Sequence, residues 1–236
     1  MVKYLFRFAH LILALLGIVL GFLVYIIDGY TPDNIHPTIW MILTLVLIIN
    51  GLLLGKIIRG LYLNFYFDNL TGLGNKDLFH LQLKLEMSQE KKTQLSLAML
   101  DLDDFKKIND TFGHPAGDMV LRDLARILKQ NVRSTDTVAR WGGEEFAIIL
   151  PYATTDGDNK ILERIRYAVQ SHDFGSKGNP IKITVSVGFV TYNDLTYIKS
   201  KNKPINHTDL FIDLADKALY KAKERKNTVV RWSFDM

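Results

Sequence analysis

Hydrophobic residues form two long uninterrupted runs near the start of the chain, and shorter periodic segments follow them. Residues 11–27 and 39–55 contain no charged side chain. A helix that spans a bilayer needs about 20 mostly apolar residues, or as few as about 17. The pattern predicts a two-helix transmembrane hairpin over residues 1–58, with spans at about 8–27 and 38–56.

A cleaved signal peptide and a pair of buried core helices are the alternatives to this hairpin. Lys3 and Arg7 suit the basic start of a signal peptide, but no convincing small-x-small cleavage motif precedes the second run. Two core helices are less favoured, since a continuous apolar run marks no polar face on either helix. We therefore expect both segments to remain in the bilayer.

The charges around the two runs predict the orientation of the hairpin. The connection 28–37 carries acidic residues but no lysine or arginine, whereas basic residues flank the other two ends, at positions 3, 7, 56 and 59. Because basic residues stay on the cytoplasmic side, we expect a multi-pass protein of the cell (inner, cytoplasmic) membrane with both termini and the following domain in the cytoplasm. Tyr30 and Trp40 suit the outer interface.

The rest of the chain alternates strand-like and helix-like segments. Residues 59–67 read as a short helical stalk, and the turn-rich segment 68–75 begins a domain at residues 68–236. Periodicity predicts strands at 95–102, 137–141, 146–150, 181–190 and 228–232. It predicts helices at 104–111, 117–132, 158–171 and 208–223, with a polar loop at 191–207. This order predicts an α/β fold of the α+β sandwich type, a central mostly antiparallel sheet flanked by helices.

Composition removes several classes of chemistry. The chain has no cysteine, which excludes disulfides, thiolate catalysis and cysteine-based metal sites. The net charge of +4 is too small to indicate nucleic-acid binding without a patterned basic face, so we expect no nucleic-acid partner.

The heptapeptide Arg-Trp-Gly-Gly-Glu-Glu-Phe at 140–146 lies between two apolar runs. Adjacent glycines between strands favour a tight hairpin, because glycine reaches the positive φ that such turns need. Glu144 and Glu145 would then lie at the tip of the hairpin, where they repel each other. A cationic group is expected nearby, and a divalent metal ion is the simplest candidate.

A second acidic group ends the strand predicted at 95–102. Capping of the next helix would explain Asp103 or Asp104. It does not explain Asp101, which is still within the strand. Asp101 and Glu145 from two strands, with a main-chain carbonyl, would leave positions for water and phosphate oxygens, as Mg²⁺ sites beside nucleotides do.

Residues 105–118 have the composition of a nucleotide-binding segment. Free amides at a helix start cradle phosphate, and Lys106 would add a positive charge. Asn109 and Asp118 together match the hydrogen-bonding edge of guanine. Each of them alone reads as a surface or capping residue, so the argument for binding rests on their joint spacing.

Five sequence blocks resemble the GGDEF family of diguanylate cyclases. The most specific are the acidic end of the strand with its helix and the Gly-His-x-x-Gly-Asp that follows, and the Gly-Gly-Glu-Glu-Phe hairpin. The other three are an opening segment and two closing segments. The five blocks lie at 101–118, 142–146, 68–73, 184–188 and 215–223, and the resemblance covers about residues 68–230. It implies a nucleotidyl-cyclase-like fold.

The resemblance implies a metal centre with two Mg²⁺ ions, for which Mn²⁺ is a substitute. Asp101 and Glu145 would bind the ions with the carbonyl oxygen of Leu102. Glu144 would be a metal carboxylate, direct or indirect, or would help to deprotonate the attacking 3′-hydroxyl. The catalytic pair implied by the family is therefore Glu144 and Glu145.

The resemblance also implies a GTP site, in which Asn109 and Asp118 recognise guanine. The triphosphate would lie on the amides near Asp104 and Phe105 and on the side chains of Lys106, Lys223 and Lys226. The closing run 223–227 departs from the family pattern because it lacks a glycine and is one residue shorter. Whether Arg225 or Lys226 contacts the triphosphate is therefore left open.

The implied reaction condenses two GTP molecules into cyclic di-GMP and releases two pyrophosphates. Each domain would bind one GTP, so a homodimer is required, and the lipid bilayer would bring two copies together through the hairpin. The product would pass to cyclic di-GMP effectors. The chain stops at Met236 without a further domain, so we expect no phosphodiesterase activity.

Arg133 and Asp136 stand shortly before the hairpin and match an Arg-x-x-Asp that the family uses as an inhibitory product-binding site. Arg164 or Arg166 would complete that site. The alternative is an ordinary exposed charge pair. Two other classes of function remain: a catalytically silent module that binds GTP or cyclic di-GMP, and a small membrane adaptor. The adaptor leaves the acidic hairpin unexplained.

Overall fold

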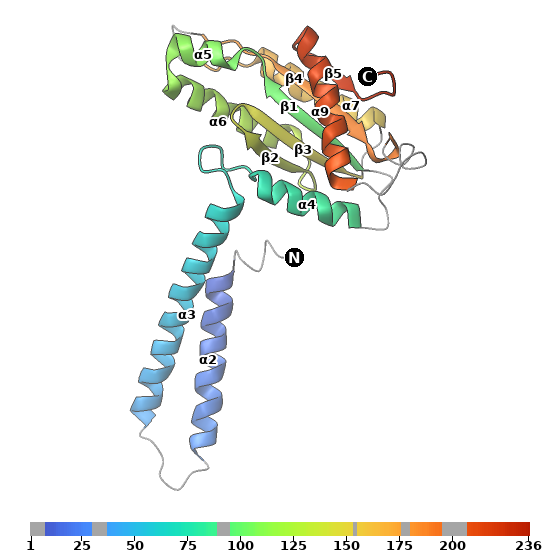
Figure 1. Ribbon diagram of the computed structural model, residues 1–236. Helices are drawn as coiled ribbons and strands as arrows, with labels where there is room; N and C mark the ends of the chain where they lie inside the picture. The colour runs from blue at the N-terminus through green and yellow to red at the C-terminus, as the bar shows by residue number, and fades with distance from the viewer. Residues whose placement is uncertain (1–7, 30–36, 89–94, 153–154, 176–179, 195–206) are drawn as a thin grey trace. The chain divides into compact units, whose positions relative to one another are not determined.

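The computed structural model describes residues 8–29, 37–88, 95–152, 155–175, 180–194 and 207–236 (Figure 1). The chain divides into two compact units, Met1–Phe65 and Tyr66–Met236. Lys3, Arg7, Tyr30 and most of the connection and loop predicted at 28–37 and 191–207 lie outside the described residues. The orientation that rests on these residues therefore stays a prediction.

The first unit consists of two helices, α2 (Ala9–Asp28) and α3 (Pro37–Tyr66). Both are long and apolar enough to cross a membrane, with mean hydropathies of 2.7 and 2.4. Only 17% and 6% of their apolar windows are buried, unlike the helices of a soluble core. By length and composition they fit a membrane hairpin. Helix α3 continues without a break through most of the predicted stalk.

Glycines allow the two helices to pack closely. A Cβ at Gly55 would lie 2.1 Å from the Cα of His10, and a Cβ at Gly51 would meet the main chain of α2 at 2.7 Å. Small residues at such crossings are typical of membrane helix pairs. Trp40 on α3 donates through Nε1 to Asp28 Oδ2 of α2 at 2.7 Å, which gives the acid a partner at that end of the hairpin.

The second unit is built on a five-stranded sheet in the order β2-β3-β1-β4-β5. The strands are β1 (Leu95–Leu102), β2 (Thr137–Gly142), β3 (Glu145–Pro151), β4 (Val185–Thr191) and β5 (Val229–Arg231). Only β4 and β5 pair in parallel, and the other neighbours are antiparallel. The mostly antiparallel sheet predicted from the sequence is confirmed.

Helices cover both faces of the sheet (Figure 1). Helices α5 (Phe105–Phe112), α6 (His114–Asn131) and α7 (Thr155–Ser171) share one hydrophobic cluster with the sheet. Helices α4 (Lys76–Ser88) and α9 (His207–Arg225) share the other. Side chains alternate along β1, so that Leu97 and Met99 face α9 while Ala98 and Leu100 face the other cluster. This alternation decides which way Asp101 points.

Two features of the unit differ from the sequence-based expectations. Helix α4 was not predicted. The strand expected to begin at Ile181 begins at Val185, and the segment before it makes loop contacts, with Ile181 accepting from the amide of Phe174 at 3.0 Å. Ile181 and Ile183 are nevertheless both buried, which explains why the alternating pattern resembles a strand.

A buried carboxyl group in the first turn of α7 makes stability depend on pH. Asp158 is buried, accepts a hydrogen bond from Ser96, and burial raises its pKa to about 6. The folded state therefore binds a proton near pH 5 that the unfolded chain does not, and the stabilisation is lost as the pH rises through about 6. Between pH 5 and 7.5 we expect the intact protein to lose about 1.4 kcal/mol more stability than Asp158→Asn. Denaturant unfolding at both pH values checks this; parallel pH profiles would contradict it.

Candidate active site

Asp101 and Glu145 lie directly opposite each other in the sheet. They are register partners at the end of the β1–β3 pair, and the next pairs on the same face are Met99 with Ala147 and Leu97 with Ile149. Side chains opposite each other on antiparallel strands have Cβ atoms about 5 Å apart. The two carboxylates predicted to share a metal therefore converge on the face of the sheet that α9 covers.

The hairpin that carries Glu145 is held rigidly. Gly143 has φ +49°, the left-handed conformation expected of a glycine in the turn. Arg140 donates through Nε and Nη2 to the carbonyl of Gly143 at 2.9 and 2.7 Å. The same side chain binds Asp68 through Nη1 at 3.1 and 3.2 Å, which ties the turn to the start of the domain. The carbonyl of Glu144 accepts from the amide of Leu102 at 3.4 Å.

The carboxylates of the site perturb each other. Burial raises the pKa of Glu145, and the charges of Asp101 and Glu144 raise it further. Burial also raises the pKa of Asp101, against the opposing effect of Lys223. Lys76 and Lys223 supply positive charge that lowers the pKa of Glu145. The cationic neighbour expected beside the acidic pair is present, and here it is lysine.

Lys223 enters the site from α9. Its ammonium group forms an ion pair with the carboxylate of Asp101 and donates to the carbonyl of Leu102 at 2.9 Å. It also donates to Asp103 Oδ1 at 3.2 Å. Two of the oxygens predicted to bind Mg²⁺ thus already surround a cation, and the donor set fits a hard divalent ion.

No three His, Asp or Glu side chains in the described part of the chain come close enough to hold a metal on their own. The expected centre contains two carboxylates and one main-chain carbonyl. The remaining coordination positions would have to come from water and from the phosphate oxygens of a nucleotide, which is usual for Mg²⁺.

The acidic run after β1 does not cap α5. Asp104 is the N-cap residue, but its side chain makes no capping hydrogen bond, and its φ of +56° is left-handed. Asp103 is buried and accepts instead from Thr184 Oγ1 at 2.6 Å and Ser186 Oγ at 2.7 Å. The amide of Asn227 adds a third bond at 2.9 Å. The capping interpretation is wrong for both aspartates, because distant parts of the chain supply their partners.

The beginning of α5 is where the sequence places the triphosphate. Phe105 is its first residue and is buried, while Lys106 is exposed. Lys226 Nζ contacts both carboxylate oxygens of Asp104, at 2.7 and 2.8 Å. Of the two candidates in the closing run, Lys226 is therefore the one whose contacts place it beside this helix. Arg225 is the last residue of α9.

The two predicted guanine readers come from the facing helices α5 and α6. A Cβ at Gly117 would lie 1.9 Å from Oδ1 of Asn109, so the amide of Asn109 occupies the space that this glycine leaves. Asp118 follows Gly117, and its half-exposed carboxylate lies 3.9 Å from Arg122. The structure therefore brings Asn109 next to the residue that precedes Asp118.

Gly117→Ala is expected to displace the amide of Asn109. If the segment binds GTP as the resemblance implies, the KM for GTP should rise about tenfold with a smaller change in kcat, because one hydrogen-bonding group of the predicted guanine site is lost. Steady-state kinetics on Gly117→Ala, Asn109→Ala and the double variant would measure this. Fully additive effects of the two substitutions would contradict the shared mechanism.

The predicted inhibitory site lies after α6. Asp136 Oδ2 accepts from the amide of Arg133 at 2.7 Å, and burial raises the pKa of Asp136. Arg164 Nη2 donates to the carbonyl of Asn131 at 2.6 Å, two residues from Arg133. Arg166 points elsewhere and bonds to residues 163, 170 and 227. Of the two arginines, Arg164 is the one that lies near Arg133.

Sequence reasoning missed two charged residues of the site. Partial burial and the neighbouring carboxylates of Glu145 and Asp213 raise the pKa of Asp216 on α9 to about 6. Lys76 at the start of α4 lies 4.3 Å above the ring of Trp141 and opposes that shift. The match of residues 215–223 to a closing segment was the available signal for Asp216.

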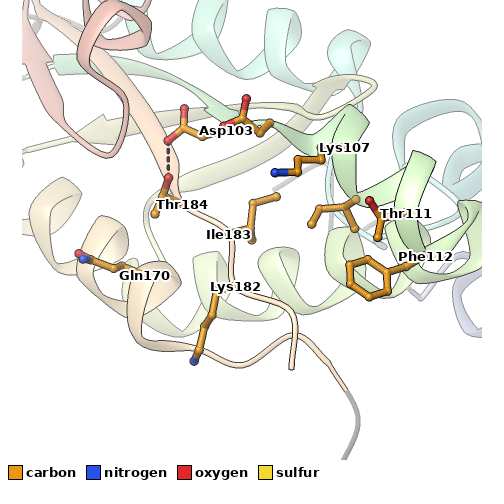
Figure 2. A pocket seen from close by; sticks show the side chains of 10 residues that line it. Asp103, Lys107, Thr111, Phe112, Gln170, Lys182, Ile183 and Thr184 are labelled. Carbon is orange, nitrogen blue, oxygen red and sulfur yellow. Dashed lines mark hydrogen bonds between the residues drawn. The ribbon is translucent and has the colours of Figure 1, made fainter. Parts of the chain in front are cut away.

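A cavity of about 490 Å³ lies beside the β1–α5 loop (Figure 2). Figure 2 shows Lys107 reaching from α5 toward the segment 182–184, and Asp103 hydrogen-bonded to Thr184 at its edge. Asp104 and four residues of α5, namely Lys107, Ile108, Thr111 and Phe112, line it, whereas the predicted metal carboxylates and guanine readers do not. The cavity therefore adjoins the predicted triphosphate site at Asp104 but does not include the predicted metal and guanine positions.

Comparison with curated proteins finds relatives that are named diguanylate cyclases. Diguanylate cyclase A of Treponema denticola is 42% identical over 141 residues, which is 59% of this chain and 35% of that protein. Diguanylate cyclase DgcP of Pseudomonas aeruginosa is 38% identical over 159 residues, 66% of this chain and 22% of that protein. The chain thus spans between about a fifth and a third of the length of these relatives.

Solved structures share the fold of the second unit. The coiled coil and GGDEF domain of DgcB from Caulobacter crescentus, in complex with c-di-GMP, is 31% identical with a TM-score of 0.66, covering 75% of this chain and 91% of that one. Diguanylate cyclase SiaD of Pseudomonas aeruginosa, in complex with its activator SiaC, is 32% identical with a TM-score of 0.62, covering 75% and 66%.

A family model described as diguanylate cyclase, GGDEF domain, matches residues 65–228, which is more than half of the 236 residues. That span contains the acidic pair of β1 and β3, both predicted guanine readers and Lys223. The chain belongs to the GGDEF-domain family of diguanylate cyclases.

Proposed function

We propose that the protein is a diguanylate cyclase, which condenses two GTP molecules into cyclic di-GMP and releases two pyrophosphates. The observation that carries this proposal is the register pair of Asp101 and Glu145, with the Leu102 carbonyl beside them. The relatives named diguanylate cyclase support the same activity.

Asp101, Glu145 and the Leu102 carbonyl would hold two Mg²⁺ ions, with Mn²⁺ as a substitute. Bound divalent ions would lower the pKa of the attacking hydroxyl and neutralise charge on the phosphoryl group. The protein's own part is to keep two carboxylates on adjacent strands at fixed separation, with Glu144 held beside them in the turn. Such preorganisation avoids reorganising charges during the reaction.

In the proposed reaction the 3′-oxygen of one GTP attacks the α-phosphorus of the other. The bond from that phosphorus to the bridging oxygen of the β-phosphate breaks, and the electron pair leaves with pyrophosphate. Glu144 takes the proton of the hydroxyl. Asn109 and Asp118 orient the base, and the amides at the beginning of α5 with Lys106, Lys223 and Lys226 hold the triphosphate.

One such site binds one GTP, so closing the ring needs a second copy of the chain. We propose a homodimer in the cytoplasmic membrane, with the apolar hairpin as anchor and both termini in the cytoplasm. Molar mass in detergent by light scattering tests the dimer, and protease accessibility of the second unit in oriented vesicles tests the orientation. A monomer with full activity would end the dimer proposal.

Incubation of the purified protein with GTP and Mg²⁺, followed by chromatography, tests the activity. We expect cyclic di-GMP and pyrophosphate in a ratio of one to two. A protein that binds GTP or cyclic di-GMP tightly but forms no product under these conditions would instead be the silent binding module.

Arg133→Ala is expected to relieve inhibition by added product, because the proposed inhibitory site of Arg133, Asp136 and Arg164 loses its first cation. The concentration of cyclic di-GMP that halves the initial rate should rise about tenfold or more. Arg166→Ala is the matched control, since Arg166 contacts other residues, and it should keep the parental inhibition curve. Identical curves for Arg133→Ala and the parent would reject the site.

A further inference from the structure

The ammonium group of Lys223 is enclosed by three acceptor groups in this structure. A lysine ammonium group has three donors. They meet three acceptors here, namely the carboxylates of Asp101 and Asp103 and the carbonyl of Leu102. Lys223 therefore cannot hold a triphosphate while these contacts last.

The ammonium group also fills the space between two predicted metal ligands. It touches Asp101 and the Leu102 carbonyl at the same time, which a divalent ion in that position would do as well. We propose that Lys223 is an internal counter-cation of the nucleotide-free protein, which must leave Asp101 and Leu102 before a divalent cation binds there. This proposal rests on the proposed function of the site.

The scaffold explains why the lysine reaches this position without a ligand. Helix α9 packs so closely on β4 that a Cβ at Gly188 would lie 1.9 Å from the amide nitrogen of Leu219. Ala222, which precedes Lys223, is buried, and the Lys223 side chain is 29% exposed. The helix therefore fixes the base of the side chain, and only its flexible stem needs to move when the ammonium group leaves.

Electrostatics gives the ammonium group a role in the empty site. Asp101 and Glu145 face each other, the charge of Asp101 raises the pKa of Glu145, and Lys223 lowers the pKa of both. Without that charge, the partly buried carboxylate of Asp101 would lose its ion-pair partner, which is costly. Asp103 keeps three other hydrogen bonds, so its position does not depend on the lysine.

Exchange of lysine for metal would couple the two halves of the substrate site. The ammonium group released by the metal becomes available to the triphosphate, and a triphosphate that binds the ammonium group clears the metal position. The two ligands should therefore strengthen each other's binding by the same factor. Lys223 thereby links metal and nucleotide binding.

Binding of Mn²⁺ to the intact, nucleotide-free protein, followed by electron paramagnetic resonance, tests the proposal. We expect Lys223→Met to bind Mn²⁺ roughly tenfold more tightly than the parent, a factor that corresponds to about 1.4 kcal/mol. Lys226→Met is the matched control, because Lys226 contacts Asp104 and neither Asp101 nor Leu102. An equal gain in Mn²⁺ affinity in Lys223→Met and Lys226→Met would indicate a general effect of removing a positive charge, and it would overturn the proposal.

A second measurement uses the parent protein and does not depend on whether Lys223→Met folds. Mn²⁺ without nucleotide should increase the reactivity of Lys223 toward an amine-labelling reagent, read by mass spectrometry, and Asp101→Asn should abolish the increase. Unchanged labelling in a protein that binds Mn²⁺ and forms cyclic di-GMP would overturn this proposal alone. Absence of both Mn²⁺ binding and product formation would overturn the proposed function with it.

Discussion

Replacing Glu145 by glutamine should reduce cyclic di-GMP formation by about three orders of magnitude or more. The substitution preserves shape and removes one of the two carboxylates that face each other across β1 and β3. A neutral amide is a poor ligand for Mg²⁺, so the ions that neutralise the phosphoryl group would be lost or misplaced. Loss of one preorganised electrostatic group costs about 10²–10³ in rate, and loss of the metal costs more.

The stability of this variant separates a catalytic defect from a folding defect. Burial and the charges of Asp101 and Glu144 raise the pKa of Glu145, which means that the folded protein tolerates its charge poorly. Glu145→Gln should therefore unfold at the same temperature as the parent or at a higher one. Glu163→Gln, which changes a glutamate on α7 whose partner is Arg166, is the matched control and should retain full activity. Product formation by Glu145→Gln at the rate of this control would contradict the assigned role.

Replacing Asp103 by asparagine should produce the largest loss of stability in the second unit. The buried carboxylate accepts from Thr184, Ser186 and the amide of Asn227, and an asparagine amide would turn its own donors toward some of these groups. Mispairing a buried, charge-assisted network costs about 3–5 kcal/mol, or roughly 6–20 °C in Tm for a unit of this size. Thermal unfolding of the intact protein would measure the loss.

The variant of the neighbouring residue Asp104 and the pH dependence of stability provide two controls for the Asp103→Asn prediction. Asp104→Asn alters an exposed carboxylate paired with Lys226 and should cost less than about 1 kcal/mol. Burial alone would raise the pKa of Asp103, but the hydrogen bonds and Lys223 outweigh it and hold that pKa below its usual value. The stabilisation is therefore present at neutral pH and lost as the pH falls below about 4. Equal stability of Asp103→Asn and Asp104→Asn at pH 7 would contradict the stabilising role of the hydrogen bonds that Asp103 accepts.

The sequence was sufficient for the parts of the site that local pattern determines. The apolar run that ends at Asp101 marks β1, and the adjacent glycines mark the turn that carries Glu144. Because side chains alternate along a strand, each carboxylate can lie on only one of the two faces of the sheet. That Asp101 and Glu145 are direct register partners follows from the β1–β3 pairing, which no local pattern specifies.

The partners of the acidic run could not be predicted, because they come from far along the chain. Thr184, Ser186 and Lys223 lie between 81 and 120 residues from Asp103. Aspartate after a strand and before a helix is typical of a cap, and only tertiary packing reveals the other use of Asp103. The same holds for Asp158, whose partner Ser96 lies 62 residues away in the mostly apolar strand β1.

The metal position can be observed directly. A crystal of the protein with Mn²⁺ and a non-hydrolysable GTP analogue, measured at the manganese absorption edge, locates the cation by its anomalous signal. The account predicts a peak between Asp101 and Glu145, bonded to the Leu102 carbonyl and to phosphate oxygens, with the Lys223 ammonium group moved to the triphosphate. A structure in which the analogue binds with no cation between these two carboxylates would contradict it.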